Sequence, residues 1–232
     1  MSLIPRFLER GFEAMLEPLV RWLIAVRVRP NAITTVGTLI LLGSAVAFGL
    51  GAIRLGGILV LLSGICDMLD GRVARGGSGT TKFGAFYDST LDRIGESALY
   101  GGIAIFFVSG GVPGSWMLVA LAATIVALAA SLIVSYARAR AEGLGLECKV
   151  GVGQRAERVL SLGLPTLFFG AGPDGFLLLA VTALLALMAV VTVIQRILHV
   201  RKITRVVRRA TQARWVAPML ADMSSRKGRS GD

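Results

Sequence analysis

Six long apolar runs, separated by short breaks, fill most of this 232-residue chain. A helix that crosses a bilayer needs about 20 mainly apolar residues, and only the fifth run is clearly shorter. The breaks at 110–114 and 170–173 contain the glycine and proline residues that end helices. Hydrophobic residues make up 54% of the chain, more than a soluble domain usually contains. We therefore predict an all-α integral membrane bundle of six transmembrane helices, at residues 32–52, 56–75, 84–109, 115–140, 157–172 and 174–200.

Basic residues alternate between the connections of these runs. Five arginines precede the first span, only Arg54 lies between the first and second, and Arg72, Arg75 and Lys82 lie at or just after the end of the second. Residues 109–115 carry no charge, whereas ten lysines or arginines lie from Arg196 onward. Cytoplasmic loops are enriched in Lys and Arg. The pattern therefore predicts a multi-pass protein of the plasma membrane with both termini in the cytoplasm.

Two flanking segments differ from the membrane domain, which we place at residues 30–209. In residues 1–29, apolar and charged residues alternate at helical spacing, which predicts an interfacial amphipathic helix. Residues 210–232 gain Ser, Gly, Lys and Arg. They predict a disordered basic tail that either contacts anionic headgroups or is simply solvated. The apolar residues of the first segment are Ile4, Phe7, Leu8, Phe12, Met15, Leu16 and Leu19.

The net charge of +11, from 25 basic and 14 acidic residues, raises the question of a nucleic-acid partner. Single-stranded nucleic acids stack on aromatic side chains, which make up only 7% of this chain. The cations instead flank apolar spans. The charge therefore favours membrane lipids over nucleic acid as the partner.

Four aspartates lie between residues 67 and 92 in an otherwise apolar region. Asp67 and Asp70 are three residues apart and Asp88 and Asp92 are four apart, so each pair shares a helix face. Carboxylates at membrane depth are costly, and they repel one another unless a cation lies among them. Oxygen ligands suit Mg²⁺ and Mn²⁺. We predict a Mg²⁺ site, with Mn²⁺ as a possible substitute, at the cytoplasmic ends of the second and third spans.

The aspartates belong to a longer pattern, Asp67-x2-Asp70-Gly71-x2-Ala74-Arg75-x8-Gly84-x3-Asp88-x3-Asp92. With every fixed position present, it resembles the signature of the CDP-alcohol phosphotransferase family from about Pro30 to Arg196. The resemblance implies transfer of a phosphatidyl group from a CDP-linked lipid, CDP-diacylglycerol, with release of CMP. It also implies a homodimer. Two cations suit this chemistry because they neutralise both the attacking and the leaving oxygen of a phosphoryl transfer.

The motif residues then divide by role. We expect Asp67, Asp70 and Asp88 to be metal ligands, while Asp92 both contacts a metal and accepts the proton of an attacking hydroxyl. The resemblance implies room for cytidine at Gly71 and Ala74, and we expect Arg75 to contact phosphate or pair with an aspartate. We also expect Asp67 and Asp70 to belong to the site of the CDP-linked lipid. Gly84 permits either close approach of a ligand or helix packing. Asn31 and Thr34 either cap the first span or, as the resemblance implies, line the nucleotide site.

Arginines of the fourth to sixth spans suggest the second substrate. They lie at the predicted cytoplasmic ends, so in a bundle they would converge near the aspartates. Arginine binds phosphate through its planar fork, which favours an acceptor that carries a phosphate. The alternative is that they only orient the protein in the membrane. These candidate acceptor-phosphate ligands are Arg138, Arg155, Arg158 and Arg196.

The run Ser135–Glu142 and the run Arg155–Arg158 are similar to those of the inositol-phosphate branch of the family. We therefore expect inositol phosphate as the acceptor. A phosphatidylglycerophosphate synthase, which uses glycerol 3-phosphate, is the alternative within the family. A divalent-cation transporter is the alternative from another class, although it would place its carboxylates along a path near the bilayer midplane.

Overall fold

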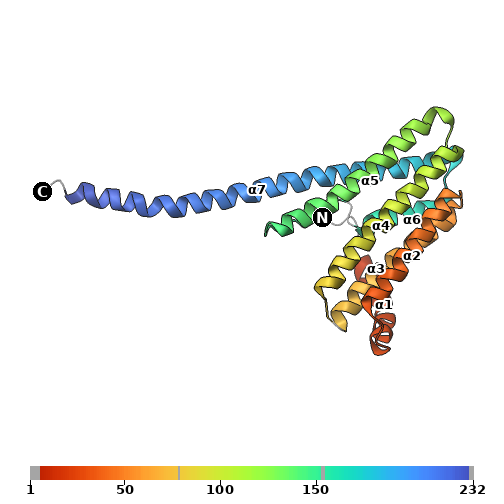
Figure 1. Ribbon diagram of the computed structural model, residues 1–232, viewed down its shortest axis with the longest axis horizontal. Helices are drawn as coiled ribbons and strands as arrows, with labels where there is room; N and C mark the ends of the chain where they lie inside the picture. The colour runs from red at the N-terminus through yellow and green to blue at the C-terminus, as the bar shows by residue number, and fades with distance from the viewer. Residues whose placement is uncertain (1–5, 78, 153–154, 230–232) are drawn as a thin grey trace.

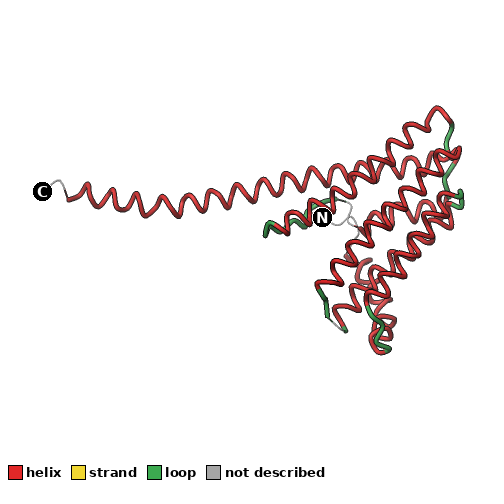
Figure 2. Tube along the Cα trace, in the orientation of Figure 1, coloured by secondary structure: helices red, strands yellow, loops and turns green. Residues whose placement is uncertain are grey.

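The computed structural model describes residues 6–77, 79–152 and 155–229, and it describes side chains between residues 15 and 205 of these. The described residues form helices and loops, with no strand among them (Figure 2). The prediction of an all-α protein is therefore confirmed. The elements are α1 (Arg6–Ala25), α2 (Pro30–Gly49), α3 (Ile53–Gly76), α4 (Lys82–Phe106), the π-turn η1 (Phe107–Gly111), α5 (Gly114–Gly143), α6 (Arg155–Phe169), the 3-10 turn η2 (Pro173–Gly175) and α7 (Phe176–Arg229).

From α2 onward, successive helices run up and down a bundle, as Figure 1 shows. Helix α2 packs against both α3 and α4, α3 also packs against α6, and α5 packs against α7. The largest fully buried side chains include Phe48, Ile103, Phe107 and Leu178. All four lie in the half of the bundle that contains the loops between α2 and α3 and between α4 and α5. These largest buried aromatic and aliphatic side chains therefore lie away from the end that carries the aspartates.

Within the residues that the structure describes, four helical segments are long and apolar enough to cross a membrane, which supports a multi-pass membrane protein. Helix α3 spans 24 residues but carries Arg54, Asp67 and Asp70 within its apolar stretch. Helix α6 has only 15 residues and contains Pro165. The four segments are Pro30–Gly49, Lys82–Gly111, Gly114–Gly143 and Pro173–Arg205.

Helix α1 occupies the predicted N-terminal helix and packs against α3. Its Leu16 and Val20 are buried in a small cluster with Leu69 and Val73 of α3. Because Ile4 and the side chains of residues 6–14 lie outside the description, most of the predicted apolar face does too. The interfacial position of α1 stays a prediction.

The C-terminal segment differs from its prediction. Instead of a disordered tail from residue 210, the structure continues α7 as one helix to Arg229, and Figure 1 shows it extending beyond the other helices. No glycine occurs between Phe176 and Gly228, and residues with high helix propensity such as Ala, Arg and Leu are frequent there. Helix propensity therefore favours the continuation as far as Pro218, a residue that disfavours a helix interior.

Local signals set the helix ends that surround the aspartates. Pro30 begins α2, where the missing N–H of proline is not needed. The Thr81 side chain accepts a 2.9 Å hydrogen bond from the backbone N–H of Gly84 and so caps α4. These two helix starts and the last turns of α3 meet at one end of the bundle.

Candidate active site

Three of the four aspartates form a compact cluster. Asp67 and Asp70 come from the last turns of α3 and Asp88 from the second turn of α4. One carboxylate oxygen of each lies within 4.8 Å of the other two. The Thr34 hydroxyl of α2 donates a 2.7 Å hydrogen bond to Oδ2 of Asp70. Three helices therefore orient these carboxylates toward one point.

This cluster fits a divalent cation. Asp70 is only 8% exposed, and Oδ1 of Asp88 is buried without a hydrogen-bond partner among the described residues. A buried acceptor that lacks a partner is unfavourable, and neighbouring carboxylates repel one another. A Mg²⁺ or Mn²⁺ ion would offset both penalties, because oxygen donors are the ligands that such ions prefer.

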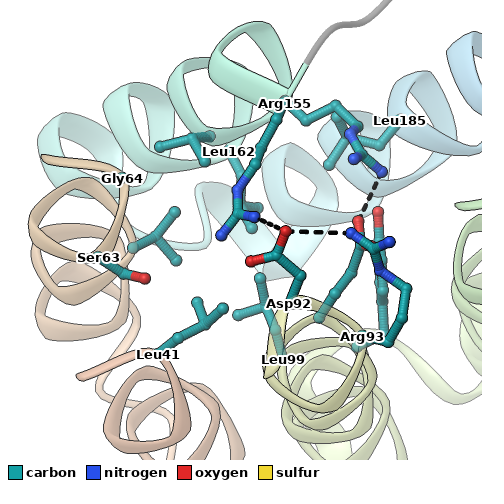
Figure 3. A pocket seen from close by; sticks show the side chains of 14 residues that line it. Leu41, Ser63, Gly64, Asp92, Arg93, Leu99, Arg155, Leu162 and Leu185 are labelled. Atoms are coloured by element: carbon teal, nitrogen blue, oxygen red, sulfur yellow. Dashed lines mark hydrogen bonds and ion pairs between the residues drawn. The ribbon is translucent and has the colours of Figure 1, made fainter. Parts of the chain in front are cut away.

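Asp92 lies next to the cluster but pairs with arginines. Its Oδ2 pairs with Nη1 of Arg155 and lies 3.1 Å from Nη2 of Arg93, as the dashed lines of Figure 3 show. Nε of Arg155 also lies 3.2 Å from Oδ2 of Asp67. Arg155 therefore bridges α6 to both α3 and α4. The structure brings the four predicted aspartates together as a group of three with Asp92 beside it.

A cavity of about 350 Å³ adjoins the cluster and matches the predicted nucleotide site. Asp67 is the one predicted nucleotide-site residue that does not line it. Asp88, Thr81 and Gly84 line it as well. The predicted residues in its wall are Asn31, Thr34, Asp70, Gly71, Ala74 and Arg75.

Two motif glycines keep this cavity open. A Cβ atom on Gly71 would lie 3.3 Å from Nη1 of Arg75, so the bare backbone leaves room for that guanidinium. A Cβ atom on Gly84 would lie 3.3 Å from Oδ1 of Asn31 and 3.0 Å from Oγ1 of Thr81. Both glycines therefore act at points of close approach between polar groups in the cavity wall.

The four candidate acceptor arginines differ in their surroundings. Arg155 contacts the aspartates, whereas Nη1 of Arg158 pairs with Glu96 at 2.6 Å. Arg196 donates to the backbone carbonyls of Val150, at 3.1 Å from Nε, and of Val134. Half-exposed Arg138 pairs with Glu142 at 2.9 Å, and both Arg138 and Arg158 repel the positive charge of Arg196. Arg138, Arg158 and Arg196 thus lie near one another, and of the four arginines only Arg155 contacts the aspartates in the described structure.

The sequence reasoning missed Glu96 and Ser131. The Ser131 hydroxyl of α5 donates a 2.5 Å hydrogen bond to Oε1 of Glu96. The same hydroxyl oxygen accepts a hydrogen bond from Nη1 of Arg158. Glu96 continues the four-residue spacing of Asp88 and Asp92, which was an available signal. Ser131 lies in an apolar run and gave none.

Comparisons with known proteins agree with this geometry. The family model of CDP-alcohol phosphatidyltransferase matches residues 27–200. The chain is 37% identical over 151 residues to a phosphatidylinositol phosphate synthase of Cutibacterium acnes, covering 65% of this chain and 71% of that protein. It is 41% identical over 128 residues to an archaetidylinositol phosphate synthase of Methanothermobacter thermautotrophicus, covering 55% and 60% of the two chains.

Solved structures of a phosphatidylinositol phosphate synthase from Mycobacterium tuberculosis are similar as well. A crystal structure with CDP-DAG bound is 32% identical and gives a TM-score of 0.67, covering 79% of this chain and 92% of that one. Another, in complex with manganese and citrate, also gives a TM-score of 0.67 at 32% identity, covering 79% and 87%. Because the family model matches residues 27–200, most of the sequence, the chain belongs to the CDP-alcohol phosphatidyltransferase family.

Proposed function

We propose that this protein transfers the phosphatidyl group of CDP-diacylglycerol to a hydroxyl of inositol phosphate and releases CMP. The observation that carries the proposal is that three features of the site lie next to one another. The carboxylate cluster, the 350 Å³ cavity and the Arg155 guanidinium share one end of the bundle. The M. tuberculosis structure with CDP-DAG bound supports the choice of donor. The name of the C. acnes relative, phosphatidylinositol phosphate synthase, supports the choice of acceptor.

The cavity would hold the CDP part of the donor. Asn31, Thr34 and Gly84 line it from the starts of α2 and α4, and Gly71, Ala74 and Arg75 line it from α3. Small residues leave space for the nucleotide, and Arg75 supplies a guanidinium for a phosphate. Asp70 and Asp88 lie in the same wall, so the diphosphate would lie next to the metal ligands.

Asp67, Asp70 and Asp88 would hold Mg²⁺, or Mn²⁺ in its place, and two ions with Asp92 as a further ligand fit the number of carboxylates. The manganese complex of the M. tuberculosis relative supports a divalent metal. When bound, the metal neutralises phosphate oxygens.

Asp92 would act as the base. Its carboxylate pairs with Arg155 and Arg93, which hold it in place beside the cluster. The acceptor hydroxyl gives its proton to Asp92 while its oxygen attacks the phosphorus on the diacylglycerol side. The bond from that phosphorus to the CMP oxygen breaks, so CMP leaves.

The phosphate of the acceptor would bind among the arginines. Arg155 is the strongest candidate because it reaches the aspartates, and Arg196 and Arg138 would complete the site from α7 and α5. Arg158 lies one turn beyond Arg155 and would add charge to the same side. A phosphorylated polyol fits these cations better than a neutral alcohol.

The membrane arrangement follows from the same features. We propose that α3 and α6 span the membrane with the four apolar segments, to give six spans in a domain of residues 30–209. The charge pattern supports a plasma-membrane protein with both termini in the cytoplasm, α1 on the membrane surface, and α7 reaching beyond it. Family resemblance supports a homodimer.

The purified protein in lipid nanodiscs tests this function directly. We expect CMP release from CDP-diacylglycerol with inositol phosphate and Mg²⁺, and none with unphosphorylated inositol. Faster release with glycerol 3-phosphate would identify a phosphatidylglycerophosphate synthase instead. Metal flux across proteoliposomes without CMP release would favour a transporter, although the carboxylates lie at one end of the bundle.

A further inference from the structure

Helices α4 and α6 contact each other at the active-site end through side chains and without close backbone packing. Among the described residues, no Cα atom of α4 lies within 8 Å of a Cα atom of α6. Helix α6 packs instead on α3 and α7. Its first turn carries Arg155, so packing on α3 and α7 places the helix, and side-chain contacts with α4 then set how that guanidinium meets Asp92.

Two layers of ion pairs make this connection. The first joins Asp92 to Arg155, and the second joins Glu96 to Arg158. Asp92 and Glu96 are four residues apart on α4, and Arg155 and Arg158 are three apart on α6, so the layers lie about one helical turn apart. The second layer is anchored to a third helix by Ser131 of α5, which contacts both Glu96 and Arg158.

The second layer is nearly enclosed. The side chains of Arg158 and Glu96 are 16% and 15% exposed, and they line a cavity of about 60 Å³ together with Asp92 and Arg155 (Figure 3). Nη1 of Arg158 makes both contacts, while its Nε is buried without a partner among the described residues. One carboxylate and one hydroxyl therefore fix the direction of this guanidinium.

We propose that Glu96 and Ser131, acting through Arg158, are positioning residues that hold the first turn of α6 so that Arg155 meets the acceptor phosphate beside Asp92. The inference rests on the proposed function. Glu96 and Ser131 touch neither the carboxylate cluster nor the nucleotide cavity. Their loss should therefore act on the acceptor, while the CDP-lipid site stays intact.

The test compares E96Q and S131A with the wild type in nanodiscs. E96Q removes the charge and keeps an oxygen, and S131A removes one hydroxyl. E147Q is the matched control, because Glu147 is an exposed loop residue that pairs only with Lys149 in the described structure. Apparent KM is measured for each substrate. Equilibrium binding of inositol phosphate in the presence of CDP and Mg²⁺ gives a value for a variant without turnover.

We expect E96Q to weaken acceptor binding about tenfold, as the loss of a charged hydrogen bond does, with a smaller loss in S131A. The KM for CDP-diacylglycerol should stay near the wild-type value in both, and E147Q should match the wild type. A double-mutant cycle with R155K then separates positioning from packing. If Glu96 acts through Arg155, then E96Q should weaken acceptor binding by less than about twofold in the R155K background.

Equal weakening of both substrates in E96Q, or a full tenfold effect of E96Q on top of R155K, would overturn the positioning role. So would unchanged acceptor binding in E96Q. A wild-type protein that binds glycerol 3-phosphate and not inositol phosphate would instead correct the proposed acceptor. The same cycle would then be measured with glycerol 3-phosphate, so the two failures are distinct.

Discussion

The Thr34 hydroxyl donates its hydrogen bond to Oδ2 of Asp70 and so ties the first turns of α2 to the last turns of α3. Thr34 is buried, and its hydroxyl also lies 3.2 Å from the backbone oxygen of Pro30. A β-branched side chain has few rotamers in a helix. Thr34 therefore holds one oxygen of Asp70 and fixes the direction of the other.

Replacing Thr34 by valine should lower the apparent affinity of the enzyme for Mg²⁺. Valine keeps the shape and removes a hydrogen bond to a charged group, which is worth about 1.5–3 kcal/mol. We expect the Mg²⁺ concentration for half-maximal CMP release to rise about tenfold, with T34S close to the wild type. An unchanged Mg²⁺ titration in T34V would show that Asp70 is oriented without this hydroxyl.

Removal of divalent metal should abolish turnover. Because three carboxylates converge within 4.8 Å, they need a cation for order as well as for chemistry. We expect a chelator to stop CMP release and added Mg²⁺ or Mn²⁺ to restore it. Thermal unfolding should occur at a lower temperature in chelator, because a ligand that binds only the folded state stabilises it. Full activity in chelator would remove the metal from the mechanism.

Asparagine substitutions should separate Asp67 from Asp92. D67N removes a member of the cluster, so it should weaken both metal and CDP-lipid binding. D92N removes the base beside the cluster, so turnover should fall while much of the CDP-lipid binding remains. Titration of a CDP-lipid analogue against both variants measures the difference. Equal loss of binding would make Asp92 an ordinary metal ligand.

A larger residue at Gly84 should block the nucleotide cavity. In G84L the new Cβ atom would lie 3.0 Å from Oγ1 of Thr81 and 3.3 Å from Oδ1 of Asn31, and all three residues line the cavity. We expect the KM for CDP-diacylglycerol to rise at least about tenfold, while the KM for the acceptor changes little. Gly101 on the same helix is the matched control, since a Cβ there would meet nothing within 4 Å. G101L should keep normal kinetics, and a similar loss in both variants would indicate a general packing defect.

Arg155 should be the most sensitive of the acceptor arginines. R155A removes the only one of the four that contacts the aspartates in the described structure, so we expect the acceptor KM to rise about tenfold or more. R138A removes a half-exposed guanidinium and should cost less. Steady-state kinetics with the acceptor varied compares the two. Near-normal acceptor kinetics in R155A would show that Arg155 only neutralises the charges of Asp67 and Asp92 and does not bind the acceptor.

The sequence predicted those parts of the site that depend on local spacing. Asp67 and Asp70 share a face because they are three residues apart on one helix, and the same holds for Gly71 and Ala74. The six predicted runs coincide with the helices α2–α7, and four helical segments of the described residues are long and apolar enough to cross a membrane, so the count of six spans stays a prediction. The assignment of Asn31 and Thr34 to the nucleotide region depended on family resemblance, and both line the cavity.

Contacts between distant segments could not be predicted in this way. Glu96 and Arg158 are 62 residues apart, and their pairing depends on how α6 is placed by its packing on α3 and α7. Positive-inside counting treats Arg138, Arg155, Arg158 and Arg196 alike, since it counts charges in loops without regard to direction. Only the packed bundle distinguishes the guanidinium that reaches the carboxylates from the one that points outward to Glu142.

The position of the nucleotide cavity at the basic ends of α2, α3 and α4 has a consequence for the lipid substrate. CDP-diacylglycerol is half nucleotide and half hydrocarbon, and moving its chains into water costs about 0.8 kcal/mol for each CH₂ group. With this cavity at the cytoplasmic membrane surface and holding the nucleotide, as proposed, the chains stay among the other lipids while the cytidine stays in water. The donor therefore reacts without leaving the bilayer, and the new phospholipid is already part of the membrane when CMP departs.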